Sequence, residues 1–441
     1  MTTSTDSRDR AGDTGQRARD LLRIAPFRWL VLGTTVNKLG SSLAPVALAF
    51  AVLDLTHSAA QLGLVVGARS AATLIFLLLG GALSDRLPRG LVLAGSSVAS
   101  AATQAAVAVV LLAHVDSVAA LCVLSALNGA FSAISGPATS GLLPLTVGAG
   151  QLTSANALAR LLQNGASVVG LAVAGLVVAL VGSGPAIAVD AATFAFGAVC
   201  FALLKLDALP HTHSGGFLRA LAEGWRAFAS RSWVWSIVVA FTLANAVYVG
   251  GIVVLGPAVA DATFGRTAWG VILAAESVGF VAGGVVALRW RPRRPLLAGI
   301  GCGIACSLLL FALGVHAPVA VLVAAAFVGG LGVEQFGVAW ETALGEHVPI
   351  ELLSRVSSYD QLGSFLAIPV GQVLAGPAAA RIGLEPTLVG GGAILAASLA
   401  ATLLVPSVRR LTSAAGRPAG APDTPHVVDP SSPDPTSAVE V

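Results

Sequence analysis

Charged side chains are scarce in this chain. Only 11% of its 441 residues are Asp, Glu, Lys or Arg, whereas 56% are hydrophobic, and the only lysines are Lys38 and Lys205. A mean hydropathy of +0.85 is far above that of a protein that folds in water, so the solvent is a lipid bilayer. Neither lysine follows the glycine pattern of a phosphate-binding loop, which argues against an ATP-driven pump within this chain.

The motifs of hydrolytic and metal-dependent enzymes are also missing. The sequence holds no HExxH, no GxSxG and no Cys/His cluster at ligand spacing. Its four cysteines all fall within apolar runs, where a thiol packs well and a disulfide framework is not expected. We therefore predict that the protein is not an enzyme and has neither a metal site nor a cofactor.

Long apolar runs are the dominant feature that remains. A helix needs about 20 mostly apolar residues to cross the hydrocarbon core, and twelve runs of that kind are separated by turn residues or charges. The fold class predicted is an all-α membrane protein with twelve transmembrane helices. The predicted spans are 28–52, 59–82, 91–113, 117–143, 157–181, 184–204, 233–256, 267–289, 295–314, 318–342, 357–380 and 385–405.

The distribution of basic residues predicts the orientation. Residues 1–27 carry five arginines and lack the features of a cleavable signal peptide. With the N-terminus in the cytoplasm, nearly all Lys and Arg outside the spans lie on the cytoplasmic side, and only Arg266 and Arg381 lie outside. Both termini are thus expected in the cytoplasm. Heavy use of Ala, Gly and Arg suggests a GC-rich bacterial genome, so the membrane is expected to be the bacterial cytoplasmic (inner) membrane.

The chain divides into two similar halves. The run from Leu152 aligns without gaps to the run from Leu353, which places Gly170 on Gly371 and Gly175 on Gly376. Such glycines allow close helix packing, and the shared register indicates parallel repeats of six helices. The predicted parts are a disordered tail at 1–20, a six-helix bundle at 21–204, a cytoplasmic linker with an amphipathic helix at 205–232, a second bundle at 233–406 and a disordered tail at 407–441.

The stretch GGALSDRLPRG, between the second and third runs, carries a concentrated set of charges. With Gly81, Asp85, Arg86 and Arg89 it resembles the cytoplasmic loop motif of the major facilitator superfamily, and further segments such as DAATF and WETALGEHVP resemble its macrolide-efflux-like and siderophore-exporter-like branch. The resemblance implies that this motif is a cytoplasmic gate between the two bundles. VVGLAVAG in the fifth span differs from the family's antiporter motif, so the direction of transport stays open.

The resemblance implies a secondary transporter that works by alternating access. A cavity formed by apolar helices with few charges suits a hydrophobic or amphiphilic small molecule, such as a drug or secondary metabolite. The resemblance implies that this molecule is exported and that an inward flow of protons drives its export. The expected partners are this substrate, protons and the lipid bilayer, without nucleic acid, and the protein is expected to be a monomer. The alternatives are an importer or uniporter of a small metabolite, and a membrane sensor or scaffold that transports nothing.

Three ionisable residues are predicted near the middle of the membrane. Lys38, Arg69 and Glu276 each lie about 14–15 Å into a span at about 1.5 Å per residue. Aligning Gly63 with Gly270 makes Arg69 and Glu276 equivalent in the repeat, both expected to face a central cavity. Burial opposes ionisation of a carboxyl group and a nearby cation favours it, so Glu276 is the first candidate for proton coupling. A permanent ion pair of Glu276 with Lys38 or Arg69 is the alternative.

Other polar residues are weaker candidates. Glu334 and Glu341 share one face of the tenth span, with Glu334 the second candidate for coupling and Glu341 a gating or helix-end group. Interhelical hydrogen bonding is an equally good explanation of both. Asp190 is expected to be solvated near the outer surface, without a chemical role. Candidate cavity-lining residues, for which packing between helices is the alternative, are Asn37, Asn128, Asn245 and Gln335.

Overall fold

The computed structural model describes residues 20–84, 89–115, 117–148, 151–204, 224–290 and 292–411. Within these ranges, twelve helical stretches are long and apolar enough to cross a membrane, which confirms the predicted number of spans. Several helices extend a few residues beyond the apolar runs; the first, α2, covers Ala25–Thr56. Helix ends at the membrane surface tolerate polar residues, and hydropathy alone therefore understates their length.

The first six spans are single helices. They are α2 (Ala25–Thr56), α3 (Ala59–Ser84), α4 (Arg89–Leu112), α5 (Val118–Thr146), α6 (Leu152–Val181) and α7 (Ser183–Ala202). Three of the last six are interrupted. The seventh is α9 (Ser232–Val249), a π-helical segment (Gly250–Leu255) and α10 (Gly256–Ala262); the ninth is α12 (Pro295–Gly303), a 3₁₀ turn (Ile304–Cys306) and α13 (Ser307–Gly314); the eleventh is α15 (Ile350–Phe365) and α16 (Ile368–Ile382). The remaining elements are α11 (Arg266–Arg289), α14 (Val319–His347), α17 (Leu384–Thr402) and the short α18 (Pro406–Arg410).

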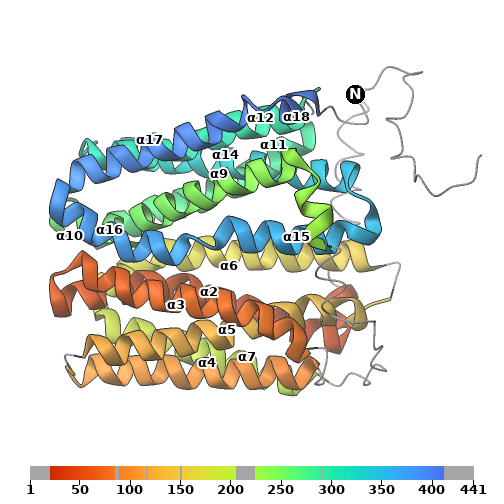
Figure 1. The fold of residues 1–441 in the computed structure, drawn as a ribbon. Helices are drawn as coiled ribbons and strands as arrows, with labels where there is room; N and C mark the ends of the chain where they lie inside the picture. The colour runs from red at the N-terminus through yellow and green to blue at the C-terminus, as the bar shows by residue number, and fades with distance from the viewer. Residues whose placement is uncertain are drawn as a thin grey trace, which may run out of the picture.

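The helices form two groups that lie side by side (Figure 1). Helices α2 to α7 make the first half, and α9 to α17 make the second. We call the end of the bundle near α18 the terminal end, and the opposite end, near α10, the distal end (Figure 1). Contacts between the halves run mainly through α6 with α11 and through α3 with α16.

Glycine contacts confirm the sequence repeat. Within the first half, Gly170 of α6 packs against the backbone carbonyl of Leu39 in α2. In the second half its predicted equivalent, Gly371 of α16, packs in the same way against Ala246 of α9. At both positions a Cβ atom would collide with backbone, and so only glycine lets these helices come this close.

The same repeat is visible where the two halves meet. Gly175 of α6 packs against the Arg266 carbonyl at the start of α11, and its equivalent Gly376 packs against Ala60 near the start of α3. Gly63 and Gly270, which we aligned to make Arg69 and Glu276 equivalent, also make equivalent contacts, each with a helix of the other half. Gly63 lies against the carbonyl of Gln372, and Gly270 lies against α6. The aligned residues thus occupy matching positions about a pseudo-twofold axis, as parallel repeats require.

These contacts between the halves concentrate at the distal end. Ala60, Gly175 and Arg266 all lie near distal helix ends, and there the two backbones touch directly. Toward the terminal end, α15 packs mainly on α9 of its own half, as far as the described residues show. The structure is therefore tightly closed at the distal end.

The linker helix docks on the bundle. Residues 224–229 are helical, and the ring of Phe228 lies 5.9 Å from that of Tyr359 in α15, with the Trp225 ring 5.5 Å from Tyr359. Phe228 is buried and Trp225 is half exposed. The part of the predicted amphipathic helix that the structure describes thus attaches to the eleventh span, whereas residues 205–223 lie outside the described residues.

Candidate functional site

Glu276 lies in the middle of α11 and is partly buried. The phenol of Tyr248, at the end of α9, donates a hydrogen bond to Glu276 Oε1. The buried thiol of Cys306, from the 3₁₀ turn of the ninth span, lies near both side chains. Sequence inspection did not associate Tyr248 or Cys306 with this carboxyl group, because the three residues come from three separate spans.

Neither of the two expected cations is paired with Glu276. Among the described residues, no ion pair joins Glu276 to Lys38 or to Arg69. Lys38 is an exposed side chain of α2, and Arg69 interacts with a different carboxylate. In this conformation the alternative of a permanent ion pair is therefore not realised, and Tyr248 holds the carboxyl group instead.

Arg69 belongs to a polar cluster inside the first half. The charge that acts on it is that of Asp190 in α7, at a separation beyond direct salt-bridge contact. Asp190 is fully buried; it accepts a hydrogen bond from Gln104 Nε2 of α4 and one from Thr193 Oγ1 at 3.4 Å. Our expectation that Asp190 is solvated was wrong, because α7 turns this side chain toward α4 and α2 rather than toward the surface.

The distal end is joined by an ion pair between the halves. Arg266, at the start of α11, donates from NH1 to Asp54 Oδ2 of α2 at 2.9 Å, and its NH2 group also binds this carboxylate. Its Nε donates to Asp261 at 2.9 Å, and its guanidinium carbon lies 4.8 Å from the ring centre of Phe50. Asp54 and Arg266 are 212 positions apart, so hydropathy and spacing gave no signal for this contact.

A second set of opposite charges, contributed by both halves, lies closer to the terminal end. Glu334, partly buried in α14, interacts electrostatically with Arg160 of α6 and with Glu341, which lies on the same face of α14 two turns further along. Arg160 and Glu341 are both exposed. No described ion pair joins Arg160 to either glutamate, so these charges face one another without contact in this conformation.

Comparison with known proteins agrees with this architecture. The sequence profile of the Major Facilitator Superfamily matches residues 30–371. The multidrug efflux pump Tap of Mycolicibacterium fortuitum is 26% identical over 378 residues, which cover 82% of this chain and 91% of Tap. The chain belongs to the major facilitator superfamily.

Solved structures of other facilitators share the fold at low sequence identity. The nucleoside transporter NupG superposes with a TM-score of 0.69 at 13% identity, covering 88% of this chain and 100% of NupG. A bacterial homolog of the human lysosomal transporter Spinster, in an inward-facing and unoccupied conformation, gives 0.64 at 14% identity, covering 87% of this chain and 96% of that one. At these identities the likeness concerns the fold.

The gate motif of this facilitator is only partly described. Gly81 lies in the last turns of α3 and Arg89 is the first residue of α4, while Asp85 and Arg86 lie outside the described residues. The described residues of the motif thus lie at the end of the second span and the start of the third, the pair of spans that the resemblance implies. Its role as a gate stays a prediction.

Most of the amide candidates in this facilitator bind other helices. Asn128 of α5 is buried and donates to Thr103 Oγ1 of α4 at 3.2 Å, and Asn245 of α9 donates to the Ser364 carbonyl of α15 at 3.0 Å. Gln335 of α14 donates to the carbonyl of Gly283 in α11. In the described conformation these three residues hold helices together. Asn37 packs against Gly197 of α7 and leaves its buried Oδ1 without a described partner.

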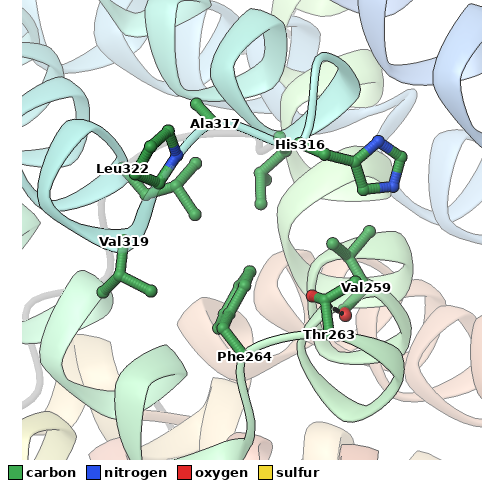
Figure 2. Close-up of a pocket in the computed structure, with 9 residues that line it drawn as sticks. Val259, Thr263, Phe264, His316, Ala317, Val319 and Leu322 are labelled. Carbon is green, nitrogen blue, oxygen red and sulfur yellow. Dashed lines mark hydrogen bonds between the residues drawn. The ribbon is translucent and has the colours of Figure 1, made fainter.

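A small pocket lies at the distal end of the second half (Figure 2). Its volume is about 220 Å³, and its lining comes from the distal ends of α10, α13 and α14, with Phe264, Leu313 and Leu322 among the apolar side chains. His316 lies at its edge and pairs with Glu385 at 3.3 Å. Binding sites for drug-sized ligands are typically about 300–1,000 Å³, and this pocket lies within one half only. It is therefore not our candidate for the transport site.

Proposed function

We propose that this facilitator exports a hydrophobic or amphiphilic small molecule in exchange for protons. The observation that carries the proposal is Glu276, a carboxyl group in the middle of an apolar span whose described hydrogen-bond partner is the Tyr248 phenol rather than a cation. An ionised carboxylate within the membrane costs at least about 2.5 kcal/mol on insertion scales unless something neutralises it. A proton is the simplest neutralising partner, and it links the charge state of the site to the pH on each side.

Export is supported by the relationship to Tap, which is named as a multidrug efflux pump. The twelve spans are apolar over most of their length, in keeping with hydrophobic cargo. Import or uniport of a small metabolite would use the same fold, and a sensor that transports nothing would keep it too. Transport measurements separate these possibilities.

The test is proton flux in liposomes. Purified protein is reconstituted with a pH dye inside, a pH gradient is imposed, and a panel of amphiphilic compounds is added. We expect at least one compound to elicit proton movement that depends on its own gradient and runs opposite to it. Movement of compound and protons in the same direction would indicate an importer. Transport of compound without protons would overturn the proposed coupling, and silence of folded protein across the panel would overturn export of such compounds.

Alternating access requires the distal end to open, and we infer that the ion pair of Arg266 with Asp54 opposes this step. Exposed ion pairs are worth about 0.2–1 kcal/mol, so we expect Arg266→Gln to increase the open fraction about 1.4- to fivefold. The readout is the labelling rate of a cysteine placed at Ala60, beneath Gly376, by a membrane-impermeant maleimide.

Arg381→Gln is the matched control, because Arg381 lies in the last turn of α16 at the same end and makes no ion pair among the described residues. It should leave the labelling rate of the cysteine at position 60 unchanged. Equal rates in Arg266→Gln and in the control would show that the ion pair has no part in closing the distal end.

A further inference from the structure

Tyr248 occupies an unusual place in the seventh span. It lies in the last turn of α9, directly before the π-helical segment Gly250–Leu255, and its hydroxyl reaches Glu276 in α11. Mid-helix π segments are rare and often occur at functional sites. The chain has one other tyrosine, Tyr359, which lies in the aromatic contact with the linker helix.

The second neighbour of Glu276 lies at another irregular point. Cys306 is the last residue of the 3₁₀ turn that interrupts the ninth span. By contrast, the backbone of Glu276 itself is held tightly, because Gly330 of α14 packs directly on its carbonyl. The Glu276 carboxyl group thus projects from a tightly packed backbone toward the seventh span, which contains the π-helical segment, and the ninth span, which contains the 3₁₀ turn.

The π-helical segment is also in contact with the interface between the halves. Gly250 packs on the carbonyl of Gly371 in α16, and Gly376 of the same helix packs on Ala60 of the first half. Two direct backbone contacts, both made by α16, therefore connect the neighbourhood of Tyr248 to the closed distal end.

We propose that Tyr248 is the positioning residue of Glu276 and transmits its protonation state to the π-helical segment. This inference rests on the proposed role of Glu276 in proton coupling. When the carboxylate is ionised, the phenol O–H donates to it. When the carboxylate takes up a proton supplied as hydronium by the aqueous phase, its own O–H donates to the phenol oxygen, and the phenol hydrogen turns toward Cys306. No proton leaves the tyrosine.

Few other groups in the described residues compete for this role. The titratable side chains that face Glu276 are Tyr248 and Cys306. The neighbouring helices carry charges that act elsewhere: Arg160 of α6 and Glu334 of α14 face each other, and Asp261 of α10 binds Arg266. A signal from Tyr248 that follows pH would therefore report on Glu276.

The two tyrosines permit a direct test by ¹⁹F NMR. Protein labelled with 3-fluorotyrosine should give two resonances, which Tyr359→Phe assigns. We expect the Tyr248 resonance to move with pH in a single step that Glu276→Gln removes, whereas Tyr359 does not respond to this substitution. In liposomes, Tyr248→Phe should reduce coupled proton flux at least fivefold and leave substrate exchange without a pH gradient within twofold. Tyr359→Phe is the control for loss of a hydroxyl group.

The outcomes separate this inference from the proposed function. If Glu276→Gln abolishes coupling while Tyr248→Phe behaves as wild type, the positioning role is wrong and Glu276 keeps its function. If Glu276→Gln retains full coupling, the proposed function of Glu276 fails, whatever the tyrosine does. A Tyr248 resonance that ignores both pH and Glu276→Gln would overturn the inference even if the phenylalanine variant fails to fold.

Discussion

Glu276→Gln is expected to lower substrate-dependent proton flux in liposomes at least tenfold. Glutamine keeps the size of the side chain and an oxygen for the Tyr248 hydrogen bond, but it cannot bind and release a proton. Exchange of labelled substrate in the absence of a pH gradient should continue, because this reaction needs binding and alternating access without net proton movement. The internal pH dye measures the first quantity and substrate uptake the second.

Two controls sharpen this result. Glu276→Asp keeps the carboxyl group and should retain part of the coupled flux. Glu385→Gln removes an exposed carboxylate at the distal end, where it faces His316, and should leave flux unchanged. Wild-type flux in Glu276→Gln would move the coupling role to Glu334, the other partly buried glutamate that we predicted from sequence.

Asp190→Asn is expected to lower the free energy of unfolding by about 3 kcal/mol. Removing one member of a buried charge pair leaves the other without compensation, which typically costs about 3–5 kcal/mol. Asp190 is fully buried, but Arg69 is only partly buried and does not contact it directly, and this favours the low end. Arg69→Met should have a similar cost. Unfolding in mixed micelles with increasing SDS measures both.

The double variant decides whether the two charges act together. If they do, Arg69→Met combined with Asp190→Asn should recover at least half of the summed loss, since neither charge is then left alone. Lys38→Met is the control, because Lys38 is an exposed charge of the same half and should change stability by about 0.5 kcal/mol or less. Fully additive losses in the double variant would contradict the pairing.

Several features followed from sequence because their causes are local. A run of about 20 apolar residues crosses a bilayer whatever its neighbours are, so the twelve spans were predictable. The repeat was predictable because Gly170 and Gly371, and likewise Gly175 and Gly376, serve the same close contacts, which tolerate no side chain. The family was recognised because a loop motif is contiguous in the chain.

Only the tertiary structure decided which polar groups meet within the membrane. The partner of a mid-span side chain depends on the rotation and the neighbours of its helix, and neither is encoded in a window of adjacent residues. Glu276 is bound by Tyr248 rather than by a cation, Arg69 interacts with Asp190 without direct contact, and Asp54 binds Arg266 from the other half. The sequence by itself determined the spans, the repeat and the superfamily, while the packing of helices distant in sequence determined the partner of Glu276 and the ion pair of Arg266 with Asp54.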